Sequence, residues 1–148
     1  MQPINEMKIK FLSKSSNESF ARIVTSGFVA QLDPTLDELN DIKTAVSEAV
    51  TNSIIHGYEN QEDKIIEIFC RLFKNGIEIQ IIDNGIGITD ISKAKEPLFT
   101  SKPYMERAGM GFTVMETFMD SIDVKSEPGH GTTVTMYKKI KQQHKTIG

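Results

Sequence analysis

A strand that ends in a carboxylate and two glycines is the feature that most constrains the fold of this chain. Apolar residues largely alternate over residues 77–82, which is typical of a β-strand with one buried face. Asp83 follows at once, and Gly85 and Gly87 stand two and four residues further on. Glycine allows dihedrals and close approaches that a side chain would block, so this stretch can bend around a ligand. The same residue types also form ordinary turns.

An upstream helical pattern carries polar residues on one side. Glu48, Asn52 and His56 recur every four residues and therefore share one face of a helix. The other face carries an apolar stripe, which is expected to pack on a sheet. It is made of Leu36, Leu39, Ile42, Val46, Val50 (or Ala49) and Ile54. Taken alone, the polar face is equally typical of a solvated helix surface.

Two more glycine motifs follow downstream. Gly109 and Gly111 stand directly before an apolar helical pattern, and the unpaired N–H groups of a helix N-terminus suit phosphate. Residues 129–133 (Gly-His-Gly-Thr-Thr) open a closing strand. A helix with Glu and Asn, followed in order by three glycine motifs, favours a nucleotide site over a set of unrelated turns.

The remaining patterns predict an α+β fold. Helices are expected near residues 15–32, 35–57 and 111–120, and strands near 7–13, 64–73, 77–83, 121–126 and 132–138. Capping-box patterns open the first two helices, at Ser15 with Glu18 and at Thr35 with Glu38. Asn75-Gly76 predicts a hairpin between antiparallel neighbours. We expect a two-layer sandwich, with a mixed, mainly antiparallel sheet covered on one face by helices.

Composition agrees with one domain over residues 1–148. At 148 residues and 39% hydrophobic, the chain can bury one core but not two of usual size. A net charge of −3 argues against direct binding of nucleic acid, which calls for clustered Lys and Arg. The lone Cys70 fits a reducing compartment, and every apolar run is far shorter than the roughly 20 residues of a membrane helix. A cytoplasmic protein without a membrane segment is expected.

With these motifs the chain resembles the GHKL superfamily, whose Bergerat ATP-binding fold is shared by gyrase, MutL and histidine kinases. Its N box resembles residues 48–57, and its glycine boxes resemble residues 83–87, 109–111 and 129–133. The resemblance implies ATP or ADP and Mg²⁺ as cofactors. It also implies that residues 88–108, which are basic and lack clear periodicity, form a lid over the nucleotide.

A narrower resemblance rests on residues 18–22, 28–34, 97–103 and 109–112. These stretches are similar to the SpoIIAB-type anti-sigma F factors of endospore-forming bacteria, and less closely to RsbW-type stress-response anti-sigma factors. The resemblance implies a homodimer that sequesters a sporulation sigma factor and phosphorylates a serine of its anti-anti-sigma factor. Two alternatives stay open: a nucleotide-gated sequestering module without phosphoryl transfer, and a detached histidine-kinase catalytic domain.

The same resemblance implies roles for particular side chains. Glu48 would act as general base, Asn52 as the Mg²⁺ ligand, and Asp83 as acceptor for the adenine amino group. Gly85 and Gly87 would let the chain pass close to the nucleotide.

The other predicted contacts lie on the phosphate side and on the partner surface. Arg107 and Lys102 would supply cations near the γ-phosphate, with Arg107 catalytic. Thr132 and Thr133 would assist at the base, Arg22 would contact a partner, and the neighbouring Phe20 is expected in the core. Backbone N–H groups would face the phosphates at Gly109, Met110 and Gly111.

Overall fold

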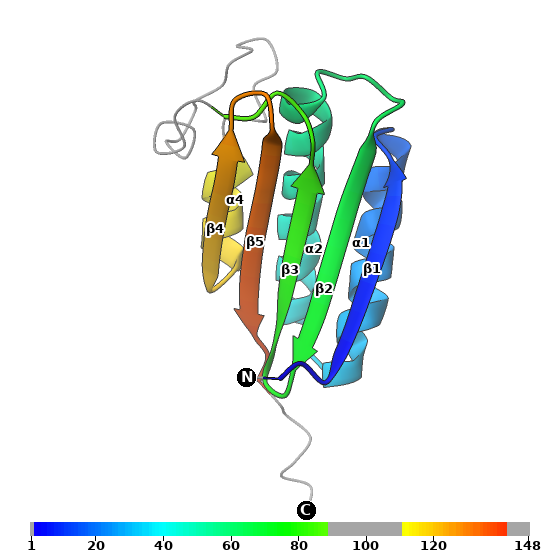
Figure 1. The fold of residues 1–148 in the computed structure, drawn as a ribbon. Coiled ribbons are helices and arrows are strands. Elements are labelled where there is room, and N and C mark those ends of the chain that lie inside the picture. Colours follow the sequence, from blue (N-terminus) through cyan, green and yellow to red (C-terminus); the bar gives the residue numbers. More distant parts are fainter. Residues whose placement is uncertain (1, 89–110, 142–148) are drawn as a thin grey trace, which may run out of the picture.

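A computed structural model of the protein describes residues 2–88 and 111–141 (Figure 1). The strands are β1 Asn5–Leu12, β2 Ile65–Phe73, β3 Gly76–Asp83, β4 Ser121–Glu127 and β5 Gly131–Lys139. The helices are α1 Ser16–Val29, α2 Leu36–Asn52 and α4 Gly111–Phe118, with a 3₁₀ turn η1 at Ala30–Leu32 and a π-helical turn η2 at Ser53–Gly57.

The five strands form one sheet in the order β1-β2-β3-β5-β4. Each of its four pairings is antiparallel, so no parallel pair occurs among the strands that the structure describes. The predicted α+β sandwich and the hairpin between β2 and β3 are confirmed, and Phe73 pairs with Gly76 across a two-residue turn. The end of β3, the β4–β5 hairpin and the last turns of α2 lie at one end of the molecule (Figure 1).

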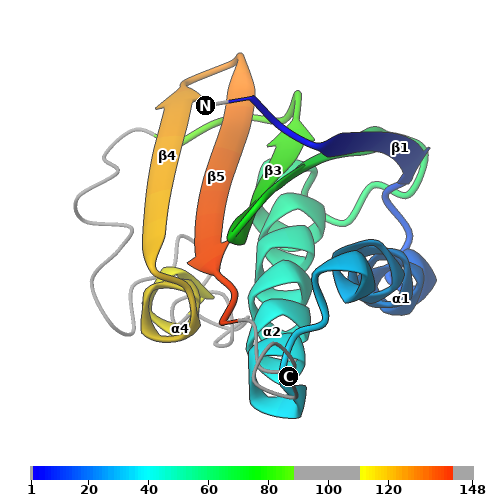
Figure 2. The same cartoon turned by 90° about the horizontal axis from the view of Figure 1, so that it is seen from below.

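The helices cover a single face of the sheet, as Figure 2 shows from below. Strand alternation sends one set of side chains toward them. This buried set includes Ile66, Ile68, Cys70 and Leu72 of β2, Ile77, Ile79 and Ile81 of β3, and Val134 and Met136 of β5. The helices contribute Ala21, Val29, Ile42, Val46, Val50 and Met115 to the same core.

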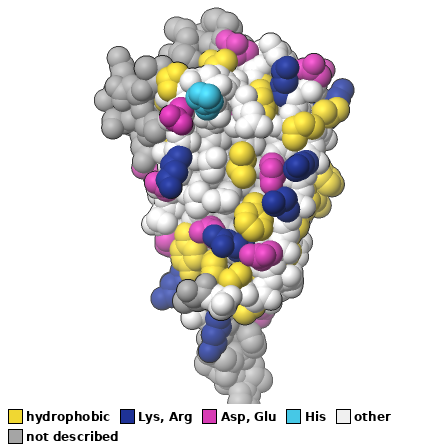
Figure 3. All heavy atoms as spheres, viewed as in Figure 1, with side chains coloured by type: hydrophobic (Ala, Val, Ile, Leu, Met, Phe, Trp, Pro, Cys, Tyr) yellow, Lys and Arg dark blue, Asp and Glu magenta, His cyan; other side chains and the backbone are white. Residues whose placement is uncertain are grey.

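The other face of the sheet is open and carries mixed charges (Figure 3). Lys8 pairs with Glu67 at 3.5 Å, and Arg71 pairs with Glu78 at 2.5 Å. Both cations also lie over the ring of Phe69, at 5.3 and 5.5 Å from its centroid. Since acidic and basic side chains alternate here, this face presents no field of one sign.

The two predicted capping boxes have different outcomes. Thr35 accepts from the backbone N–H of Glu38 at 3.0 Å, and the Glu38 carboxylate accepts from the backbone N–H of Thr35 at 2.9 Å, so that box is confirmed. Ser15 makes no side-chain cap bond, and the prediction there is wrong. The Glu18 carboxylate turns away from the helix start and takes partners within reach, Arg22 at 2.9 Å and the hydroxyl of Ser47.

Two residues that the sequence predicts in the hydrophobic core are exposed. Leu36 is 73% exposed because it is the first residue of α2 and precedes the turn that reaches the sheet. Phe20 is 47% exposed, and its ring makes a T-shaped contact with the ring of Phe11, with centroids 6.4 Å apart. Among the helices described, none is both long and apolar enough to cross a membrane.

Candidate functional site

Asp83 is the centre of the site. It is the last residue of β3 and continues the inward row of Ile77, Ile79 and Ile81, so only 4% of it is exposed. Ser53 Oγ donates to its Oδ2 at 2.8 Å, and the N–H of Gly85 donates to its Oδ1 at 3.0 Å. Burial raises the pKa of this carboxyl, and hydrogen bonds from the backbone of Gly85, from Ser53 and from the backbone of Thr132 lower it.

The C-terminal end of α2 lies beside this carboxylate. The helix widens there into the π turn, in which the N–H of Tyr58 donates to the carbonyl of Ser53 at 2.8 Å. Short π-helical segments are rare and occur often at functional sites. Glu48, one turn before Asn52 on the same side of the helix, is only 6% exposed. The polar face of this helix is therefore not the solvated surface that its sequence alone permits.

The Asn52 side chain is buried without a hydrogen bond. Neither its Oδ1 nor its Nδ2 has a partner among the described residues. Gly111, the first residue of α4, packs directly against this amide, since a Cβ at Gly111 would come within 2.6 Å of Nδ2. A buried amide left unsatisfied costs about 1–3 kcal/mol, so the arrangement fits a group that is held for a ligand.

The glycines after β3 let two backbone segments meet. A Cβ at Gly85 would lie 2.0 Å from the carbonyl oxygen of Gly57, and the next N–H, of Ile86, donates to that oxygen at 2.9 Å. Gly87 has a φ of +79°, and a Cβ there would lie 2.1 Å from the Glu127 carbonyl. Both glycines are thus required by contacts within the protein, whether or not a nucleotide also approaches them.

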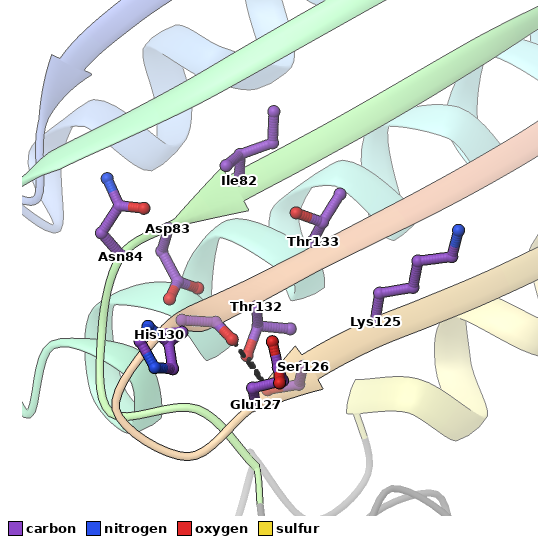
Figure 4. Close-up of a pocket in the computed structure, with 10 residues that line it drawn as sticks. Ile82, Asp83, Asn84, Lys125, Ser126, Glu127, His130, Thr132 and Thr133 are labelled. Carbon is purple, nitrogen blue, oxygen red and sulfur yellow. Dashed lines mark hydrogen bonds between the residues drawn. The ribbon is translucent and has the colours of Figure 1, made fainter.

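Thr132 and Thr133 reach the site from opposite faces of the sheet. In the register of β3 with β5, Thr132 faces Asp83, and Thr133 faces Ile82 on the open side of the sheet. Figure 4 shows Asp83 and Thr132 on one side and Ile82 and Thr133 on the other. Because successive strand residues point to opposite faces, only Thr132 lies beside Asp83, and the predicted role of Thr133 at the base stays a prediction.

A hydroxyl chain supports Thr132. Ser126 Oγ lies 2.8 Å from Thr132 Oγ1, donates to the carbonyl of Gly131 at 2.9 Å, and accepts from the N–H of Ile88 at 2.7 Å (Figure 4). Because the Ser126 hydrogen goes to the Gly131 carbonyl, Thr132 is the donor between the two hydroxyls. Thr132 is then left with acceptor capacity only.

A hollow of about 180 Å³ opens at this end of the sheet. The described residues around it come from both faces and include Asp83, Thr132 and Thr133, but neither Glu48 nor Asn52. Small-molecule sites measure roughly 300 Å³ or more. The hollow is therefore one edge of the site, which is better defined by the side chains themselves.

Comparison with known proteins decides the family. Residues 14–138 match the family described as histidine kinase-like ATPase domain. The chain belongs to this ATPase family. It is 62% identical over 136 residues to an anti-sigma F factor of Clostridium beijerinckii, covering 92% of this chain and 95% of that protein. It is 58% identical over 137 residues to an anti-sigma F factor of Clostridium novyi, covering 93% and 96%. With these relatives, the chain is a member of the anti-sigma F factor family.

A solved structure of the RsbU and RsbW domains of a Mycobacterium tuberculosis protein has the same fold. The TM-score is 0.67 at 18% identity, over 93% of this chain and 33% of that one. At this identity the likeness concerns the fold alone. It agrees with the sandwich predicted from the sequence.

The residues of this ATPase-family site fit Mg²⁺ and a nucleotide in two respects. The unsatisfied amide of Asn52 offers a neutral oxygen of the kind that Mg²⁺ accepts. No group of three or more His, Cys, Asp or Glu in the described ranges could hold a metal, so a magnesium ion here would take its other ligands from phosphate and water. Asp83 in its ionised form offers acceptors only.

Four predicted site residues lie outside the described residues: Lys102, Arg107, Gly109 and Met110. Nearly all of the predicted lid lies there too, with Ile88 as its only described residue. Arg22 lies on α1. Its guanidinium pairs with Glu18, and its side chain is 38% exposed.

Two residues of the site escaped the sequence-based prediction. Ser53 is 4% exposed and donates to Asp83. Tyr58 is 6% exposed, and its Oη accepts from the N–H of Asn84 at 2.7 Å and donates to the carbonyl of Ile65 at 2.5 Å. The pKa of Tyr58 is raised, mainly by burial. Ser53 did carry a signal, since it continues the buried row of Ile42 and Ala49 on α2.

Proposed function

We propose that this protein is an anti-sigma factor that binds ATP with Mg²⁺ and transfers the γ-phosphoryl group to a serine of an anti-anti-sigma protein. One observation carries the proposal. Glu48 is buried one turn before the unsatisfied Asn52, on the helix whose end contacts Asp83. A base, a metal ligand and an acceptor for adenine would thus be held on two adjoining elements.

Each side chain has a role in this proposal. Asp83 accepts from the amino group of adenine, and Thr132 accepts from a water beside the base. Asn52 holds Mg²⁺, which when bound neutralises charge on the phosphates and orients them. Arg107 and Lys102 add cations at the γ-phosphate, and the backbone N–H groups of residues 109–111 bind phosphate oxygens.

Glu48 is the general base. The hydroxyl of the substrate serine gives its proton to the Glu48 carboxylate while its oxygen attacks the γ-phosphorus. The bond from the γ-phosphorus to the bridging oxygen breaks, and the electrons leave with ADP. The products are phosphoserine and ADP, and positioning with charge neutralisation supplies most of the rate enhancement.

The relatives suggest the partners. Proteins named anti-sigma F factor are 62% and 58% identical to this chain over more than nine-tenths of its length. We infer that the bound factor is a sporulation sigma factor of the F type, that the protein acts as a homodimer in the cytoplasm, and that Arg22 contacts a partner. Such a protein regulates transcription without touching nucleic acid.

The decisive experiment is intact mass spectrometry of a purified anti-anti-sigma protein after incubation with this chain and Mg-ATP. We expect the mass of one phosphate, located by fragmentation on a single serine. Glu48→Gln provides the control, and its reaction should give no added mass.

Other results would select a different function. Bound ATP and captured sigma factor without transfer would mean a nucleotide-gated sequestering module, and Glu48 would lose its proposed role. Phosphate on a histidine would indicate a histidine-kinase catalytic domain.

A further inference from the structure

Ser53 is a hydroxyl in an otherwise apolar row. The side of α2 that packs on the sheet presents Ile42, Ala45, Val46 and Ala49, all at most 1% exposed. Ser53 follows one turn after Ala49 in the same row, and it is 4% exposed. A buried hydroxyl among apolar neighbours needs a partner, because its burial without a hydrogen bond is costly.

That partner is the Asp83 carboxylate. The two side chains come from elements 30 residues apart, and Ser53 Oγ lies 2.8 Å from Oδ2 of Asp83. Gly85 holds the other oxygen through its N–H at 3.0 Å, and Gly57 closes the third side, where a Cβ would lie 2.9 Å from Oδ1. The carboxylate is therefore fixed in orientation by the π turn and the glycine loop together.

We propose that Ser53 is a positioning residue for base selection, whose hydroxyl holds Asp83 with its remaining acceptor sites turned to the base. This inference rests on the proposed function, since it requires a purine beside Asp83. A carboxylate has about four acceptor positions. Ser53 and Gly85 occupy one on each oxygen, and the backbone of Thr132 is a third donor to this carboxylate. The unoccupied positions attract a base with an amino group and repel one with a carbonyl there.

The hydroxyl also maintains the acceptor character of the site. Hydrogen bonds to the ionised form oppose the effect of burial on Asp83, and the bond from Ser53 is one of them. A protonated carboxyl can donate, so it would tolerate a carbonyl on the base. Loss of the hydroxyl should thus weaken discrimination rather than weaken all nucleotide binding equally.

The test compares ATP with inosine triphosphate, which carries a carbonyl in place of the adenine amino group. Dissociation constants of both are measured by isothermal titration calorimetry with the full chain and Mg²⁺. For Ser53→Ala we expect ATP to bind about tenfold more weakly, which corresponds to one hydrogen bond to a charged group. Inosine triphosphate should change less than about twofold, so the ratio of the two constants falls by about fivefold to tenfold.

Three further variants separate positioning from packing. Ser53→Cys keeps a similar volume with a weak donor and should resemble Ser53→Ala, so a failure of the alanine variant to fold leaves the test in place. Ser53→Thr restores a hydroxyl and should restore the wild-type ratio. Thr25→Val removes another buried hydroxyl, on α1, and should leave the ratio unchanged.

The outcomes are distinct for the two proposals. A wild-type preference for ATP that survives in Ser53→Ala and Ser53→Cys would overturn the role of Ser53 and leave the proposed function standing. An equal loss of both nucleotides would also overturn it, because Ser53 would then support the fold only. If the wild-type chain binds neither nucleotide, the proposed function fails and this inference fails with it.

Discussion

The polar groups at the two ends of α2 differ in how they are satisfied. At the N-terminal end, Thr35 and Glu38 satisfy each other reciprocally, and the second oxygen of Glu38 accepts from the N–H of Lys141 at 2.9 Å. At the C-terminal end the helix widens into a π turn, the amide of Asn52 has no hydrogen bond within the described residues, and Glu48 is buried. One helix thus combines an end built for stability with an end that is costly to fold.

The difference between the two ends indicates that the free energy of ligand binding acts at the C-terminal end of α2. Sites that bind and react hold polar groups in positions that the folded protein alone does not favour. The unsatisfied amide of Asn52 becomes favourable when a cation arrives. Substitutions at the C-terminal end should therefore reduce function with little loss of stability, and substitutions at the N-terminal end should do the reverse.

The largest effect is expected for Glu48→Gln. The amide keeps the shape of the side chain but cannot take the proton of the serine, and loss of a general base costs about 10²–10⁴-fold in rate. ATP affinity should stay within about twofold, which is about 0.4 kcal/mol. Single-turnover transfer of labelled phosphate measures the first quantity, and calorimetry measures the second.

Glu38→Gln is the matched control for that substitution. It lies on the same helix and makes the same change of charge, and glutamine also serves in a capping box. Transfer by this variant should be close to that of the wild type. Retained transfer in Glu48→Gln, or an equal loss in Glu38→Gln, would remove the contrast between the two ends.

The next largest effect is expected for Asp83→Asn. The asparagine oxygen can accept from Gly85, and its amide can donate to Ser53, but the acceptor for adenine is lost. We expect ATP affinity to fall about thirtyfold, which is about 2 kcal/mol, by titration calorimetry. Asp123→Asn, an exposed change on β4, should leave ATP affinity unchanged.

The same variant has a pH signature in stability. Burial raises the pKa of Asp83 above its unfolded value, so the folded protein holds this proton more tightly. Stability therefore falls as pH rises from the unfolded pKa through the folded pKa, and the penalty persists above that window. Asp83→Asn should remove this dependence and equal or exceed the wild type in urea unfolding at neutral pH. A large destabilisation at neutral pH would contradict it.

A smaller effect is expected for Asn52→Ala. The variant loses one oxygen ligand, so the Mg²⁺ concentration needed for ATP binding should rise about tenfold, or about 1.4 kcal/mol. Stability without nucleotide should be equal or higher, because an unsatisfied buried amide is removed. Magnesium titrations at fixed ATP and thermal unfolding measure the two effects. Asn40→Ala, exposed on the same helix, should change neither.

Much of the site was predictable because periodicity carries it. Spacing by four placed Glu48 and Asn52 on one face, and alternation made Asp83 the last inward residue of its strand. Alternation also separates Thr133 from Thr132, because a step of one residue sends its side chain to the other face of the sheet. Thr132 and Thr133 are neighbours in the sequence motif, whereas their side chains lie on opposite faces of the strand.

The remaining errors arose where a local pattern had a competing partner. Ser15 and Glu18 have the spacing of a capping box, but Glu18 pairs with Arg22 and Ser47, and Ser47 comes from another helix. The π turn has no sequence signature of its own, and its last residue, Gly57, packs against Gly85 of a segment distant in sequence. Tertiary contacts of this kind cannot be inferred from one segment.

The smallest effect is expected at the N-terminal end, for Thr35→Ala. The hydroxyl that accepts from Glu38 is lost, and removal of an N-cap costs about 1 kcal/mol, or roughly 2–4 °C in Tm for a chain of this size. Thr35→Ser should retain the stability, and Thr44→Ala, exposed in the middle of α2, should cost nothing. ATP affinity should be unchanged in all three, because no described contact links this cap to Asp83. A change of more than about twofold in ATP affinity for Thr35→Ala would mean that the two ends are coupled through the helix.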